Sequence, residues 1–289
     1  MSYTYDGLTY SSMGSLPKNA EKSFQFFLIR LLSGTASVSN SKFISKQRID
    51  YSQLPPAVQT KKLSAAVADF LSTYEVGGDP KSFIQKTISD NRRFYQDLLG
   101  EFSNYYLQEQ RGNQTAAFIF LYRILEKLSY SVPLLYCATQ RDYMGTFNDL
   151  KALFDDKVKG ELSLFKKFLN QGRFIDSIKL DITYQLQFSS NCGYASKYFE
   201  LARKHHNDYV SEDSNAYQLG IKFRQVPELL IKLRNRFFHS LTGEDKHNIR
   251  LEEILDPDEF FACVNPVFCS FLSIVTLQTL ARKYQSQDS

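Results

Sequence analysis

A long uncharged segment near the C-terminus constrains the fold most, because no acidic or basic residue occurs from Phe260 to Ala281. Just before it, Asp256 can cap a helix and Pro257 suits the first helical turn. The sequence therefore predicts one long helix that runs to about Tyr284 and is kinked at Pro266, where the backbone lacks an N–H donor.

This segment is long enough to span a bilayer, but polar residues are spread through it: Asn265, Ser270, Ser273, Thr276, Gln278 and Thr279. The rest of the sequence offers no second segment of this kind. A helix buried in a helical core explains the pattern as well, so we expect a core helix and no membrane contact. The first 15 residues are polar and carry no secretory signal, which favours a cytoplasmic location.

The composition is that of a folded, mildly basic protein. The chain has 289 residues, 43% of them hydrophobic, with a formal charge of +4 and a pI near 8.7. That balance permits an RNA partner without requiring one. The four cysteines form no C-x-x-C pair and have no histidine at metal-ligand spacing, so we predict reduced thiols, no metal site and no cofactor.

Apolar residues recur at helical spacing through most of the chain, which predicts a mainly α-helical fold. The expected helices before the uncharged segment span residues 20–32, 57–74, 82–110, 115–138, 147–157, 161–170, 195–209 and 216–240. Three other segments are expected to lack regular structure: a flexible arm at residues 1–15, a loop at 36–52 and a polar turn at 211–215.

Residues 178–188 depart from the helical pattern. Apolar and mostly polar residues alternate there with a period of two, which is typical of a strand. Ile175, Ile178, Ile182 and Leu186 would also fit one face of a helix, so the pattern leaves both structures open. We favour a small strand or hairpin inserted into the helical fold.

The pattern with the clearest chemistry lies in the segment expected to be helical at 216–240, where Arg234 to His239 reads RNRFFH. Arginine offers a fixed fork of donors that suits two phosphate oxygens. A histidine near its ordinary pKa can take or give a proton around pH 7. Together they could support RNA cleavage by attack of the neighbouring 2′-OH without any metal.

The spacing limits that scheme. Residues five apart on an ideal helix are separated by about 140° around the axis, so Arg234 and His239 would not converge from one straight helix. A single histidine also does not easily serve as both acid and base in one turnover. A two-fold dimer would bring two arginines and two histidines into one cleft.

This segment resembles the R-N-x-x-x-H signature of the HEPN family (higher eukaryotes and prokaryotes nucleotide-binding), many members of which are metal-independent ribonucleases. The match assigns Arg234 to the motif arginine, Asn235 to the polar residue after it and His239 to the motif histidine. The segment 118–126 resembles an early HEPN helix that packs against the motif helix and adds polar residues near the cleft, here Arg123 and Glu126.

The resemblance covers roughly residues 90–284. It implies a HEPN-like helical bundle at 90–289 that follows a helical N-terminal region at 1–89 of unknown role. It further implies a homodimer with a composite site, an RNA substrate that Arg236 helps to bind, and a toxin or anti-phage, abortive-infection role. A regulatory protein or antitoxin would then be a partner.

Two other interpretations stay open at this point. The domain could be a non-catalytic HEPN-like module for dimerisation and for nucleotide or protein binding. Alternatively, Arg234 and Arg236 lie on a solvated face while His239 caps a helix C-terminus. A second basic segment, Arg203 to His206, could contact phosphate, but we expect it to be a helix end that faces solvent.

Overall fold

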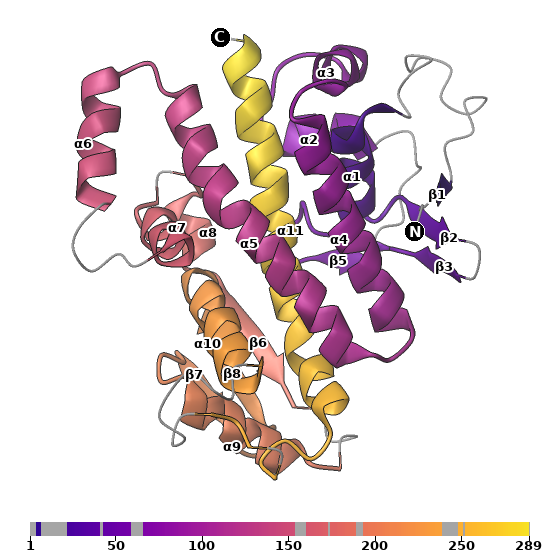
Figure 1. Cartoon of the computed structure of the whole chain (residues 1–289), viewed down its shortest axis with the longest axis vertical. Coiled ribbons are helices and arrows are strands. Elements are labelled where there is room, and N and C mark those ends of the chain that lie inside the picture. The colour runs from indigo at the N-terminus through magenta and orange to yellow at the C-terminus, as the bar shows by residue number, and fades with distance from the viewer. Residues whose placement is uncertain are drawn as a thin grey trace. The chain divides into compact units, whose positions relative to one another are not determined.

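The computed structural model describes residues 4–6, 22–40, 43–58, 66–153, 160–172, 174–188, 193–238, 248–250 and 252–288. Within these ranges the chain is mainly helical and carries small antiparallel sheets (Figure 1). It divides into two compact units. The first comprises Met1–Arg111, Leu134–Arg141 and Ser273–Ser289, and the second comprises Gly112–Pro133 and Asp142–Leu272. The functional division at residues 89–90 that the resemblance implies stays a prediction.

The elements of the first unit surround α1. They are β1 (Thr4–Asp6), α1 (Phe24–Leu32), β2 (Ser37–Asn40), β3 (Phe43–Lys46), β4 (Ile49–Asp50), β5 (Ala57–Val58), α2 (Ala66–Thr73), α3 (Pro80–Thr87), α4 (Arg92–Gln110) and the C-terminal part of α11 (Pro257–Asp288). Ser23 caps α1 by accepting a hydrogen bond from the Phe26 backbone N–H at 3.2 Å. Even Arg30 is buried in this helix, and burial lowers its pKa to about 10 while its guanidinium donates to the Thr35 carbonyl at 2.8 Å.

Four expectations for the first unit were wrong. Residues 36–52 are not a loop, because β2 pairs with β3 and β4 pairs with β5. The helix expected at 57–74 does not include Ala57–Val58, which form β5, and its described part is α2. Thr4–Asp6 are not part of a flexible arm, because they form β1 and pair with β2. The helix expected at 82–110 is two helices, α3 and α4, and Asn91 between them has a left-handed backbone.

The second unit contains the candidate chemistry. Its elements are the first part of α5 (Gln114–Thr139), α6 (Tyr143–Leu153), α7 (Glu161–Asn170), α8 (Ser177–Leu180), β6 (Thr183–Gln187), α9 (Ala195–His205), β7 (Ser211–Asp213), β8 (Gln218–Lys222), a 3₁₀ turn (Phe223–Gln225), α10 (Val226–Phe238) and the N-terminal part of α11. The sheet order is β6-β8-β7, all antiparallel.

The strand prediction is confirmed for residues 183–187, which form β6, whereas Ser177–Leu180 form one helical turn. Two neighbouring expectations were wrong. The expected turn at 211–215 contains strand β7, and the expected helix at 216–240 begins with strand β8. β8 is the central strand, and a Cβ at Gly220 would collide with the Ser211 side chain.

The start of α11 is as the sequence indicates. Asp256 Oδ1 accepts hydrogen bonds from the backbone N–H groups of Asp258 at 3.0 Å and Glu259 at 3.3 Å. Among the described residues, one helical segment, Pro257–Gln285, is long enough and apolar enough to cross a membrane. In its most apolar 18-residue window, 83% is buried inside the protein. Such burial is typical of a core helix.

Candidate functional site

Helix α10 carries the described part of the motif and packs against α5. Leu229, Leu230 and Leu233 are buried along one face of α10. Near its end, the Phe238 ring stacks on the Phe118 ring of α5 with centroids 5.8 Å apart and planes 8° apart. α5 therefore lies directly beside the end of α10.

Arg234 faces α5. Its guanidinium carbon lies 4.8 Å from the centre of the Tyr122 ring, which is a cation–π contact. Arg234 Nη1 also donates a hydrogen bond to Asn235 Oδ1 at 3.0 Å. Two neighbours thus hold the guanidinium, one by its face and one by its edge.

Arg236 faces the opposite way, because residues two apart on a helix are separated by about 200°. Its Nη1 hydrogen-bonds His205 Nδ1 and donates to the His205 carbonyl at 3.2 Å. Since arginine can only donate, Nδ1 must accept, which places the ring proton on Nε2. Burial lowers the pKa of Arg236. This arginine is held against the end of α9.

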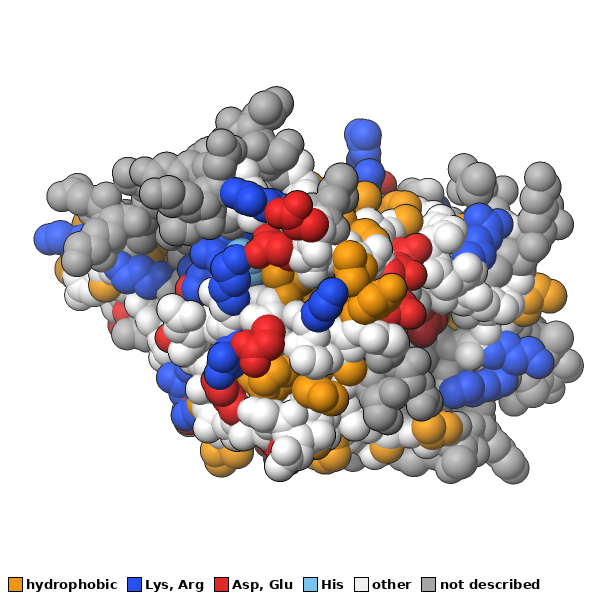
Figure 2. Space-filling model, turned by 90° about the horizontal axis from the view of Figure 1, so that it is seen from below, with side chains coloured by type: hydrophobic (Ala, Val, Ile, Leu, Met, Phe, Trp, Pro, Cys, Tyr) orange, Lys and Arg blue, Asp and Glu red, His pale blue; other side chains and the backbone are white. Residues whose placement is uncertain are grey.

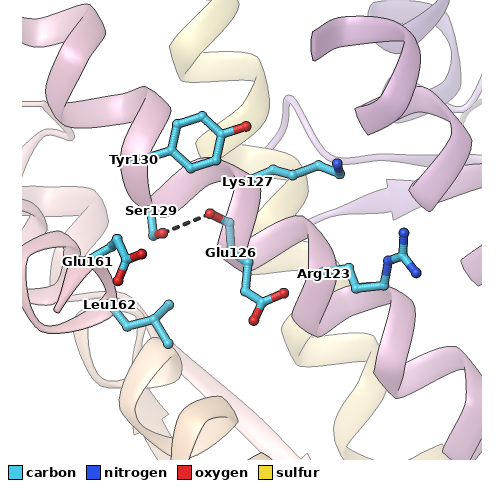
Figure 3. A pocket seen from close by; sticks show the side chains of 7 residues that line it. All are labelled: Arg123, Glu126, Lys127, Ser129, Tyr130, Glu161 and Leu162. Carbon is cyan, nitrogen blue, oxygen red and sulfur yellow. Dashed lines mark hydrogen bonds between the residues drawn. The ribbon is translucent and has the colours of Figure 1, made fainter. Parts of the chain in front are cut away.

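A pocket of about 510 Å³ opens between α5 and α7. Its lining consists of Arg123, Glu126, Lys127, Ser129 and Tyr130 from α5 with Glu161 and Leu162 from α7. Figure 3 shows the carboxylates of Glu126 and Glu161 in the space between the two helices, whereas the side chains of Arg123 and Lys127 extend away from α7. The pocket therefore offers acceptors at its centre, and its cationic groups lie on the side away from α7.

Tyr122 connects Arg234 to this pocket. Burial raises the pKa of Tyr122, the positive charge of Arg234 opposes that rise, and the negative charges of Glu126 and Glu161 add to it. One hydroxyl thus lies within electrostatic range of the motif arginine and of both pocket carboxylates.

The structure brings together most of the residues named from the sequence. Arg123 and Glu126 line the pocket, and Arg234 packs on Tyr122, whose pKa is affected by the charges of Glu126 and Glu161. Arg236 lies on the other side of α10. His239 lies outside the described residues.

Sequence reasoning missed Tyr122 and most of the pocket lining, which comprises Lys127, Ser129, Tyr130, Glu161 and Leu162. Tyr122 lies in the apolar stripe of α5, where its spacing is that of a core residue. Glu161 occupies the first turn of α7, where an acidic residue is expected for reasons of helix stability alone. Neither position in the sequence indicates that α7 lies near α5, because that proximity depends on tertiary packing.

The expectation for the end of α9 was wrong for the two histidines, although Arg203 and Lys204 are exposed. His205 and His206 do not face solvent, since their exposed fractions are 3% and 1%. His206 packs edge-to-face on Tyr209, with ring centres 5.0 Å apart. Burial lowers the pKa of His206 to about 4, and the ring is therefore neutral at pH 7.

Charge is mixed on the face of the molecule in Figure 2. Acidic and basic side chains are interspersed with apolar ones over the described part of that face. Such a surface does not by itself attract a polyanion strongly. Any recognition of RNA there must come from local groups.

Comparisons with protein-family models, with curated proteins and with solved structures returned no match for this chain. The family resemblance of the motif therefore depends on the residues of this chain alone.

Proposed function

We propose that the protein is a metal-independent endoribonuclease of the HEPN type, which cleaves RNA by 2′-OH attack at a site completed by a second copy of the chain. The observation that carries the proposal is the position of Arg234. Its guanidinium is oriented by Tyr122 and Asn235 beside a pocket that contains acidic, basic and aromatic groups.

Arg234 is the cation that stabilises the crowded phosphate in this mechanism. Asn235 accepts from one of its N–H groups, and the stacking on Tyr122 fixes the plane of the fork. Preorganised donors of this kind act where negative charge develops. His239 is the acid or base that moves the proton of the 2′-OH or of the leaving 5′-oxygen.

The pocket between α5 and α7 is the place for a nucleotide next to the cleaved bond. Glu126 and Glu161 repel phosphate but accept hydrogen bonds from exocyclic amines or a 2′-OH. Tyr130 exposes 48% of its surface at the pocket edge, and an exposed aromatic ring can stack on a base. Arg123 would contact the RNA backbone.

The composite site follows from the spacing of the motif. Arg234 and His239 do not converge on one straight helix, and two proton transfers need two groups. A homodimer supplies both. A toxin or anti-phage effector under the control of a regulatory protein is the biological role that the motif suggests, and a cytoplasmic location fits an RNA substrate.

The test compares RNA cleavage by the wild type, His239→Ala and Arg234→Ala, with EDTA present. Each variant is expected to lose activity by about 100-fold or more, since each removes a proton-transfer or charge-stabilising group. The wild-type products should carry 2′,3′-cyclic phosphate ends. Arg250→Ala is the matched control, because Arg250 is a surface arginine that pairs with Glu252, and its activity should stay unchanged.

Unaltered cleavage by His239→Ala would refute the mechanism. A second function, nucleotide binding without cleavage, is favoured by the same pocket, because its cations and its exposed Tyr130 suit a nucleotide. Saturable nucleotide binding that Glu126→Gln weakens, with no cleavage products from the wild type, would establish that function instead.

A further inference from the structure

We propose that the end of α9 and the first turn of α10 bind one divalent transition-metal ion of the zinc class, with His206, Asp208 and Glu228 as its protein ligands. This inference does not depend on the ribonuclease proposal. None of the three residues lines the pocket between α5 and α7, and none belongs to the groups assigned to cleavage.

The geometry is that of a nearly assembled site. One ring nitrogen of His206 and one carboxylate oxygen from each of Asp208 and Glu228 all lie within 4.8 Å of one another. Ligand atoms around a tetrahedral zinc ion, with bonds of about 2.0–2.2 Å, are about 3.4 Å apart. Asp208 is exposed beyond the end of α9, so a change of its side-chain rotamer can close the remaining distance.

His206 gives the second, independent observation. Its side chain is 1% exposed, and neither ring nitrogen has a hydrogen-bond partner among the described residues. Buried polar atoms are nearly always paired, and an unpaired imidazole is costly. The ring is neutral, which is the form that ligates a metal. A metal ion would supply the missing partner for one nitrogen.

Two lysines form ion pairs with the Glu228 carboxylate and leave some of its lone pairs available. Lys232 Nζ lies 2.8 Å from Glu228 Oε1, and Lys166 Nζ lies 3.5 Å from Oε2. A carboxylate offers two oxygens with about four lone-pair sites, so it can ligate a metal and keep a lysine. Such outer partners commonly orient metal-binding carboxylates.

The donor set selects the ion. One imidazole and two carboxylates suit Zn²⁺, whereas Mg²⁺ and Ca²⁺ are bound through oxygen alone. Three protein ligands leave a fourth position for water. The ion would tie the end of α9 to α10 beside the hydrogen bonds between Arg236 and His205.

The experiment uses the full chain after removal of metals with a chelator. Calorimetric titration with ZnCl₂ should show one ion per chain with a dissociation constant of about 1 μM or below, whereas MgCl₂ should give no saturable binding. At a free Zn²⁺ concentration 100 times that constant, the melting temperature should rise by about 5 °C.

Asp208→Asn is the decisive variant, because the exposed side chain can change without disturbing the core. It should weaken Zn²⁺ binding by about tenfold or more. Glu252→Gln, an exposed carboxylate outside the cluster, is the matched control and should bind like the wild type. Equal affinity of the wild type and Asp208→Asn, or no saturable Zn²⁺ binding by the wild type, would overturn the proposal.

Discussion

The two sides of α10 use the same residue type in different ways. Arg234 stacks on Tyr122 beside an open pocket, and its hydrogen bond to Asn235 is exposed. Arg236 instead hydrogen-bonds the buried His205 at the end of α9. Two arginines separated by one residue therefore have different surroundings: Arg234 contacts the Tyr122 ring of α5, and Arg236 contacts the end of α9.

The largest expected effect concerns cleavage. Arg234→Ala should lower the RNA cleavage rate by about 100- to 1,000-fold, because a preorganised charge-stabilising group is lost. Arg236→Ala should lower it by less than tenfold at a temperature where both proteins are folded. Single-turnover rates on one RNA oligonucleotide measure the difference. Equal losses in the two variants would mean that both arginines act on the RNA.

The second prediction concerns stability, to which Arg236 should contribute more than Arg234. Arg236→Ala should lower the free energy of unfolding by about 2 kcal/mol, since charge-assisted hydrogen bonds to His205 are lost. Arg234→Ala should cost about 1 kcal/mol or less, because a partly exposed cation–π contact contributes little. Urea denaturation followed by circular dichroism gives both values. A larger loss for Arg234→Ala would contradict the division of roles.

The helices were easier to predict than the strands, and particular residues explain why. The predicted bounds of α7 match those observed, and Asp256 begins α11, because capping and helical periodicity are local signals. β8 was missed, because its five residues form a strand by pairing with β7 and with β6, and β6 lies about 35 residues earlier. Short strands depend on distant partners.

The residues of the candidate site likewise fall into two groups, those that the sequence predicts and those that only the tertiary structure reveals. Arg123, Glu126 and Arg234 could be named from one motif and one helix pattern. Glu161 could not, because its position beside α5 is set by how α7 packs. The burial of His206 was also hidden, since a His-His pair that follows Arg203 and Lys204 has the sequence of a solvated helix end.

The α9 side of α10 should also be the pH-sensitive side. Burial, followed by the charges of Lys232 and Arg236, lowers the pKa of His206 to about 4, although Asp208 and Glu228 oppose the shift. The unfolded chain protonates this residue near its ordinary pKa of about 6.5, so its contribution to stability is complete above that pH and is lost as the pH falls toward 4.

The expected slope is about 1 kcal/mol per pH unit between pH 6 and pH 4.5. His206→Gln should remove that part of the pH dependence. Urea denaturation of both proteins in chelator-treated buffer measures it. The same slope in the wild type and the variant would show that His206 is not the group responsible.

The smallest expected effect on cleavage concerns the Tyr122 ring, on which the Arg234 guanidinium stacks. Tyr122→Phe keeps the ring and should change the cleavage rate by less than about twofold, whereas Tyr122→Leu should lower it by about fivefold, since a cation–π contact contributes about 1 kcal/mol. Both rates come from the single-turnover assay. A large loss in Tyr122→Phe would instead give the hydroxyl a direct part in cleavage.

The most direct test of the composite site uses mixed dimers. Wild-type chains are combined with an equal amount of chains that carry both Arg234→Ala and His239→Ala, after dissociation and reassociation of the dimers. If one cleft needs both copies, only wild-type dimers cleave RNA, and random pairing leaves about a quarter of the activity of the same total amount of wild-type chains. Activity close to one half would show that each chain acts alone, and would contradict the composite site.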